Sequence, residues 1–111
     1  MELEAKKLLL DVSTSCEAIQ EFTTGKSFSD YEQSRLLRSA TEREFEVIGE
    51  ALARLRKLNP NVAGQITSLD AIIAFRNRII HGYDSVDDVI VWNTIQTHVP
   101  VLLTEAKVLL A

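Results

Sequence analysis

Between positions 74 and 83 the chain reads Ala74-Phe75-Arg76-Asn77-Arg78-Ile79-Ile80-His81-Gly82-Tyr83, the only segment where arginine, asparagine, histidine and tyrosine gather. Read as a helix, it places Asn77 and His81, four positions apart, on one face. Arg76 lies about 140° from His81 on an ideal helix, so the two side chains can converge only on a group held in a cleft. A phosphate between a guanidinium and an imidazole is such a group. Gly82, a residue type that commonly ends helices in a left-handed turn, predicts the helix end.

Helical spacing continues from this segment towards the N-terminus and predicts a third helix from about Leu69 to His81. Its start carries the S/T-x-x-D spacing of Thr67 to Asp70. The apolar residues lie on more than one side of the helix: Leu69, Ile72, Ile73, Ala74, Phe75, Ile79 and Ile80. Such a helix packs centrally or lies at a subunit interface. We therefore expect a symmetric homodimer with this helix near the two-fold axis.

Apolar residues also recur at helical spacing in the rest of the chain. The expected helices are Leu3 to about Phe22, about Tyr31 to Leu58 with room for a break near Ser34, about Asp87 to Val99, and Pro100 to Leu110. The residues expected to cap or end them are Gly25, Ser29 or Asp30, Asn59 to Asn61, and Asp87, with a loop from Val62 to Ile66. The fourth helix is expected to bury Val89, Trp92, Ile95 and Val99. The fold class is all-α: one domain over residues 1–111, a compact up-and-down bundle of four long helices and a shorter one.

Composition narrows the functional class. The 111 residues are 46% hydrophobic and 25% charged, as in an ordinary soluble globule. No apolar run approaches the ~20 residues of a membrane-spanning helix, and the acidic start lacks the layout of a secretory signal, so a cytoplasmic location is expected. The net charge of −4 does not suit a general nucleic-acid coat. If RNA binds, the positive potential must be local, from Arg76 and Arg78, with Arg35, Arg38 and Arg43 as further candidates.

Other reactive side chains have simpler interpretations. Cys16 stands alone on the apolar stripe of the first helix, which favours a buried small hydrophobe over a reactive thiol. Glu46 and Glu50 could bind a metal or share a proton, but surface glutamates, or partners for Arg76 or Arg43, are favoured. Gly49 between them costs about 1 kcal/mol relative to alanine, which indicates a close helix crossing. We interpret His98 as an ordinary histidine at a helix end.

The pattern Arg76-x4-His81-x-Tyr83, with polar Asn77 after the arginine, resembles the signature of the HEPN superfamily. The added tyrosine makes it similar to the HepT-type toxin branch. The segment from Arg43 to Ala51, which reads REFEVIGEA, is similar to the second-helix pattern of that branch. The resemblance extends over nearly the whole chain.

This resemblance implies a metal-independent endoribonuclease toxin that acts as a homodimer, with the motifs of both subunits lining one cleft. Arg76 and His81 match the catalytic pair, and Asn77 matches the polar residue that supports it. Tyr83 matches the tyrosine that a partner antitoxin, a minimal nucleotidyltransferase, modifies with AMP. The implied partners are RNA, a second copy of the chain and the antitoxin, with the dimer alone or in a larger complex.

The chemistry of RNA cleavage agrees with these residue types. Attack by the RNA's own 2′-hydroxyl needs neither a metal nor a cofactor. It needs a proton-transfer group near neutral pH, and histidine has an unperturbed pKa of ~6.5. It also needs a permanent cation for the charged transition state, a role that suits arginine. We expect Arg78 to be a further RNA contact.

Two other classes stay open. The chain could be a non-catalytic helical module that binds a nucleotide or a nucleotidyltransferase, or a purely structural helical dimer. In those cases Arg76 would pair with Glu46 or Glu50 to join two helices, and His81 would favour the helix C-terminus through the dipole. Tyr83 would then be an interface aromatic.

Overall fold

Seven helices make up most of the computed structural model, which describes residues 1–82 and 84–111 and contains no strand in that part of the chain. They are α1 (Leu3–Thr23), α2 (Phe28–Gln33), α3 (Arg35–Leu58), α4 (Pro60–Ala63), α5 (Leu69–His81), α6 (Asp88–Thr97) and α7 (Val99–Leu110). Tyr83, on which the AMP-modification hypothesis depends, lies outside the described residues. None of the described helices combines the length and apolar content needed to cross a membrane.

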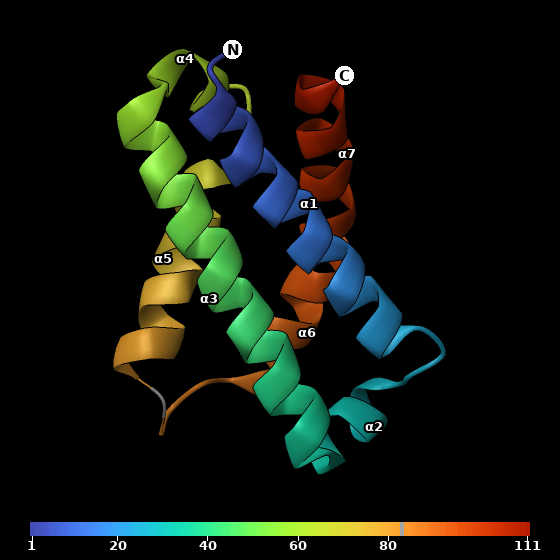
Figure 1. The fold of residues 1–111 in the computed structure, drawn as a ribbon. Helices are drawn as coiled ribbons and strands as arrows, with labels where there is room; N and C mark the ends of the chain where they lie inside the picture. The colour runs from blue at the N-terminus through green and yellow to red at the C-terminus, as the bar shows by residue number, and fades with distance from the viewer. Residues whose placement is uncertain (83) are drawn as a thin grey trace.

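The helices run alternately down and up, as Figure 1 shows. From the N-terminus α1 descends, α3 returns, α5 descends again, and α6 and α7 rise in succession to the C-terminus beside the start of the chain. Helix α3 packs against α1 and α5, and α1 also packs against α7. The expected all-α, up-and-down bundle is therefore confirmed.

Residue Ser34 divides the predicted second helix into α2 and α3. Its extended backbone (φ −106°, ψ 104°) interrupts the helix, and its side chain accepts a hydrogen bond from Leu37 N and so caps α3. The predicted caps Ser29 and Asp30 were wrong, because α2 begins earlier. Ser27 is the cap there, and its hydroxyl accepts from Asp30 N while the Asp30 carboxylate accepts from Ser27 N. These two bonds hold the pKa of Asp30 below its ordinary value.

Two further local predictions were wrong. Part of the expected loop after α3 forms the single helical turn α4, which the Asn59 side chain caps through Val62 N. Gly82 ends α5 at φ −122° and is not left-handed. A Cβ at Gly82 would lie 3.0 Å from both the Arg78 carbonyl oxygen and the Ser85 hydroxyl, so a close approach explains the glycine there. Gly25, by contrast, does turn left-handed after α1, with φ 74°.

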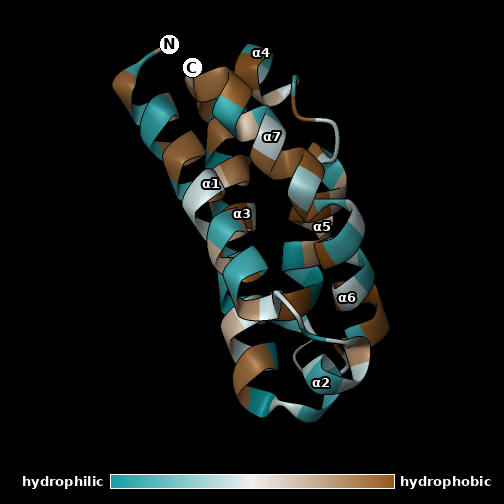
Figure 2. Ribbon diagram, turned by 90° about the vertical axis from the view of Figure 1, so that its right-hand side faces the viewer, coloured by the Kyte–Doolittle hydropathy of each residue, from teal (hydrophilic) through white to brown (hydrophobic). Residues whose placement is uncertain are grey.

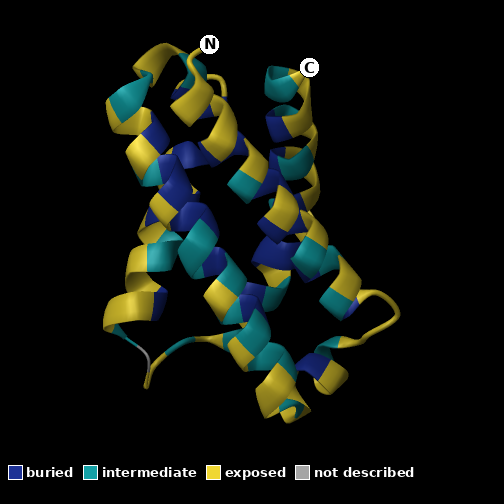
Figure 3. Ribbon diagram, in the orientation of Figure 1, coloured by how far each residue is buried: buried dark blue, intermediate teal, exposed yellow. Residues whose placement is uncertain are grey.

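The core lies between α1, α3, α5 and the α6–α7 pair. Hydrophobic and hydrophilic positions alternate along each helix in Figure 2, and buried positions recur along the same helices in Figure 3. The largest fully buried side chains are Tyr31, Phe45, Leu9, Ile19, Ile48, Leu52, Leu55, Ile72, Leu102, Val12, Val91 and Val99. Trp92 is partly buried and packs against Phe28 and Tyr31, which joins α2 to α6. Val89 was predicted to be buried but is 61% exposed, because the inward face of α6 carries Val91 and Ile95.

Candidate active site

Helix α5 crosses α3 at Gly49, and the residue it brings there is Arg76. A Cβ on Gly49 would lie 2.3 Å from Arg76 Cβ and 2.4 Å from Arg76 Cγ. These distances are far shorter than any ordinary carbon–carbon contact, so only glycine fits at this crossing. The close helix crossing predicted from the sequence is confirmed.

The Arg76 guanidinium is held against α3 by a carboxylate. Its Nη1 donates to Glu50 Oε2 at 2.9 Å, and the second oxygen, Glu50 Oε1, accepts from Arg54 Nε at 3.0 Å. Arg54 and then Arg76 keep the pKa of Glu50 below its ordinary value. The Arg76 side chain is only 15% exposed, and its Nε is buried without a hydrogen-bond partner among the described residues.

The sequence hypothesis that Glu50 partners Arg76 is therefore confirmed. Glu46, the other candidate, instead accepts from Arg43 Nη1 at 3.1 Å on its own helix. Among residues 1–82 and 84–111, no three histidine, cysteine or acidic side chains cluster as metal ligands would. Glu46 and Glu50 of α3 are thus ion-pair partners of arginines.

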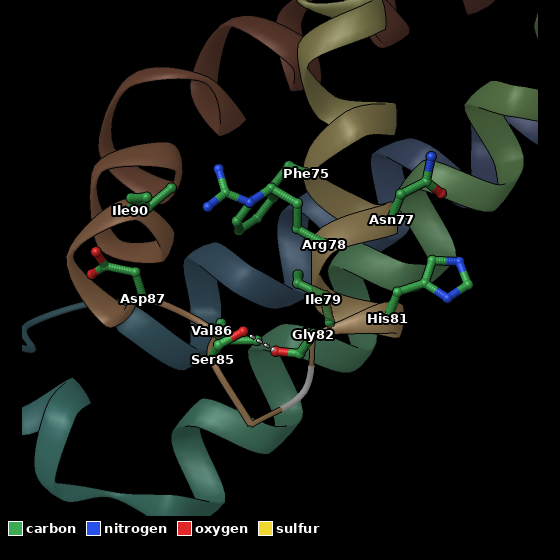
Figure 4. A pocket seen from close by; sticks show the side chains of 10 residues that line it. All are labelled: Phe75, Asn77, Arg78, Ile79, His81, Gly82, Ser85, Val86, Asp87 and Ile90. Atoms are coloured by element: carbon green, nitrogen blue, oxygen red, sulfur yellow. Dashed lines mark hydrogen bonds between the residues drawn. The ribbon is translucent and has the colours of Figure 1, made fainter.

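A pocket opens beside the C-terminal end of α5, between that helix and the start of α6. Its volume is about 390 Å³, and its lining residues are Phe75, Asn77, Arg78, Ile79, His81, Gly82, Ser85, Val86, Asp87 and Ile90. Figure 4 shows Asn77 and His81 on one side of α5, as their spacing predicted, and Arg78 on the other side towards Asp87 and Ile90. His81 is exposed here, so a ligand or water can reach its side chain.

The structure brings three of the predicted site residues to one pocket, and the remaining predicted residues among those it describes lie elsewhere. Asn77, Arg78 and His81 line the pocket, whereas Arg76 does not and faces Glu50 instead. Arg35, Arg38 and Arg43 also lie outside the pocket lining. Arg38 donates to the Glu32 carbonyl oxygen on the neighbouring α2, and Arg43 pairs with Glu46 on its own helix.

His98 has a role that the sequence did not reveal. Its Nδ1 lies 2.9 Å from the Ser68 hydroxyl, and the ring is half-buried, so it joins the start of α7 to the start of α5. His98 also lines a smaller hollow of about 200 Å³ together with Phe75, Arg78 and Ile90, three residues shared with the pocket beside His81. The two partners lie 30 positions apart, and no local spacing signals such a contact.

Comparison with known proteins identifies the family of this chain. The family described as ribonuclease HepT-like matches residues 12–109, and the chain belongs to this family. A protein from Caldanaerobacter subterraneus subsp. tengcongensis, named as a candidate RNase, is 33% identical over 95 residues, which cover 86% of this chain and 84% of the relative. No solved structure gave a significant match.

Two archaeal relatives extend over more of the chain. One, from Methanocaldococcus jannaschii and also named as a candidate RNase, is 27% identical over 109 residues, or 95% of each chain. The other, from Thermococcus cleftensis and named "Probable ribonuclease HepT", is 28% identical over 106 residues, or 92% of each chain. The relatives thus connect this fold with ribonucleases at the level of the family.

Proposed function

We propose that this chain is a metal-independent endoribonuclease toxin of the cytoplasm, in which Arg76 and His81 carry the reaction. The observation that carries the proposal is the pocket beside His81 and Asn77, in a chain that belongs to the HepT-like ribonuclease family. An exposed imidazole at the edge of such a pocket suits proton transfer to or from a bound RNA strand.

In the proposed reaction the ribose 2′-oxygen attacks the adjacent phosphorus and the bond to the 5′-oxygen of the next nucleotide breaks. The products are a 2′,3′-cyclic phosphate and a free 5′-hydroxyl. One proton leaves the 2′-hydroxyl and one reaches the departing 5′-oxygen, and His81 serves this transfer. The fixed charge of Arg76 stabilises the extra negative charge on the phosphoryl oxygens in the transition state.

A second copy of the chain completes the proposed site. Within one chain Arg76 faces α3 while His81 lies in the pocket, so pairing of two motifs is a route to bring both groups to one RNA phosphate. Exposed apolar side chains at the end of α5 and the start of α6 support an interface there. They are Ile80, Val89 and Ile90, with 42%, 61% and 38% exposure.

The test of the reaction is RNA cleavage by the wild type, Arg76→Ala, Arg76→Lys and His81→Ala, with and without EDTA. Loss of a proton-transfer group should lower the rate by about 10²–10⁴-fold. Arg76→Lys should fail too, because a point charge does not reproduce a planar guanidinium. Undiminished cleavage by His81→Ala, or its loss in EDTA, would exclude this mechanism. No cleavage by the wild type, with binding of a nucleotidyltransferase retained, would favour the non-catalytic module.

We further propose that a minimal nucleotidyltransferase antitoxin neutralises the toxin at Tyr83. The tyrosine oxygen would attack the α-phosphorus of ATP, lose its proton and release pyrophosphate, leaving AMP on the side chain. In the sequence Tyr83 follows Gly82, which lines the pocket with His81. A bulky anion attached next to this pocket would occupy space and repel the RNA backbone.

Intact-mass spectrometry with the nucleotidyltransferase and ATP should show AMP added to the wild type and none to Tyr83→Phe. The variant should keep its RNase activity and escape inhibition, because it lacks only the modified hydroxyl. Equal modification of the variant, or full cleavage by the modified wild type, would show that Tyr83 has no such role.

A further inference from the structure

Arg54, Glu50 and Arg76 form a continuous chain of charges across the α3–α5 crossing. We infer that Glu50 is a positioning residue, which fixes the Arg76 guanidinium in the orientation that the cleaved phosphate requires. This inference rests on the proposed function. It assigns a part in RNA cleavage to a carboxylate that lies outside the pocket beside His81.

The packing of Arg76 restricts which of its protons can reach a phosphate. The stem of the side chain is clamped where α5 crosses Gly49, and the Nε proton is buried. Nη1 already donates to Glu50. The protons left for a ligand are therefore those of Nη2 and the second proton of Nη1, which lie on the far end of the guanidinium. A phosphate that approaches this end can accept two parallel hydrogen bonds.

Glu50 is itself held from the other side, and this makes it a suitable support. Arg54, one helical turn further along α3, binds Glu50 Oε1 and leaves Oε2 for Arg76. The ion pair at Oε1 restricts the rotamers of Glu50, so Oε2 is held in a defined position as the hydrogen-bond acceptor for the Arg76 guanidinium. Because Glu50 is half exposed, the ion pair itself contributes little to the stability of the fold.

The same contact would have the opposite effect if Glu50 competed with RNA for Arg76. Removal of a competitor would free the guanidinium and raise activity, whereas removal of a support would let the guanidinium rotate away and lower activity. The sign of the change in kcat therefore separates the two roles. Small misplacements of a catalytic group are costly, with about 10²-fold lost for 1 Å.

The experiment compares Glu50→Ala and Glu50→Gln with Glu46→Ala as the matched control, and measures kcat, KM and Tm for each. Glu46 lies one turn earlier on α3 and pairs with Arg43 on the same helix, whereas among the described residues the ion-pair partner of Arg76 is Glu50. Glu50→Ala should lower kcat by about 10- to 100-fold with a much smaller change in KM and an unchanged Tm. Glu50→Gln should recover most of kcat, because its amide oxygen still accepts from Nη1. Glu46→Ala should keep the wild-type kcat.

The Arg54→Ala variant tests the positioning role a second time with Glu50 left in place. The kcat of this variant should lie between those of the wild type and Glu50→Ala. A kcat in Glu50→Ala that equals or exceeds the wild-type value would overturn the positioning role, as would an equal loss in Glu46→Ala. Wild-type cleavage that depends on Arg76, together with no effect at Glu50, would refute this inference alone. Cleavage independent of Arg76, or no cleavage at all, would overturn the proposed function and this inference with it.

Discussion

At the scale of single residues, burial determines the protonation of several side chains. Cys16 is fully buried, and this burial, together with the nearby charge of Glu17, raises the pKa of its thiol to about 12. The thiol is thus a small hydrophobe at neutral pH, as its position on the apolar stripe predicted. Partial burial likewise raises the pKa of Glu42, and repulsion from Asp88 and Glu46 adds to the effect while Arg38 opposes it.

Glu42 should make the protein less stable as pH rises. A carboxyl whose pKa is higher in the folded than in the unfolded state binds its proton more tightly when folded. The free energy of unfolding therefore falls as pH rises from the unfolded pKa through the folded pKa, and the penalty persists above that window. Burial raises the pKa of the nearby Tyr31 hydroxyl, and repulsion from the charge of Glu42 adds to that rise.

We expect Glu42→Gln to have a higher Tm than the wild type near pH 7, because the variant loses the buried charge. Near pH 3, below both pKa values, Glu42 is protonated and the difference in Tm should vanish. Thermal unfolding at the two pH values measures this, with Glu44→Gln on the same helix as the control for loss of an acidic residue. A Glu42→Gln variant that is destabilised at neutral pH would show that the charge is favourable.

At the scale of elements, the crossing of α3 and α5 sets the geometry of the candidate site. Gly49 lets α5 approach so closely that the aliphatic part of the Arg76 side chain lies against the α3 backbone. The Arg76 guanidinium therefore reaches Glu50, the residue that follows Gly49 on α3. Side-chain caps, and not apolar spacing, determine where α2 and α3 begin. The Ser27 and Ser34 hydroxyls accept hydrogen bonds from backbone amides of the first turn that would otherwise be unpaired.

Gly49→Ala should destabilise the fold by about 1–3 kcal/mol, because a methyl group in a packed crossing forces the helices apart. The shift should also move Arg76 and lower RNase activity. Gly64→Ala is the matched control, because Gly64 has a helical φ of −64° and an added Cβ there would lie 3.2 Å from the Pro60 carbonyl oxygen, a tight contact but a far milder one than the 2.3 Å at Gly49. Urea unfolding of both variants measures the difference, and equal stability of the two would contradict the close crossing.

At the scale of the whole molecule, exposed apolar side chains on α5 and α6 lie next to the pocket that holds His81. Ile90 lines this pocket. Val89 precedes Ile90 in the sequence, and Ile80 lies between the lining residues Ile79 and His81. Exposed apolar patches mark interaction sites, so this rim supports our proposal that a second subunit completes the site.

Light scattering at micromolar concentration should give twice the chain mass of 12.4 kDa for the wild type. Val89→Asp should give a monomer with reduced RNase activity, because a charge in the interface would have to be buried. Val108→Asp, a change at a 68% exposed valine on α7, should stay dimeric. A monomeric wild type, or a fully active monomeric Val89→Asp variant, would exclude the shared cleft.

The sequence by itself determined the helices and most of the breaks between them. The break at Ser34 and the cap at Asp87 depend on interactions within a few residues, which local spacing and side-chain chemistry record. The bounds of α5 agree with the predicted ones, although no side chain caps the start of this helix. The motif from Arg76 to Tyr83 indicated a resemblance to the family, and the match over residues 12–109 showed that the chain belongs to it. The close helix crossing at Gly49 could be predicted because a glycine inside a helix lowers its stability, and close packing explains why glycine is present there.

Only the tertiary structure decided which side chains meet. Arg76 and Glu50 are 26 positions apart, and Ser68 and His98 are 30 apart, so their pairing depends on how helices cross and not on any local pattern. The sequence left Glu46 and Glu50 as equal partners for Arg76, and the α3–α5 crossing selected Glu50. Val89 turned outwards for the same reason, because the packing of α6 against its neighbours, and not its helical spacing alone, chose the buried face.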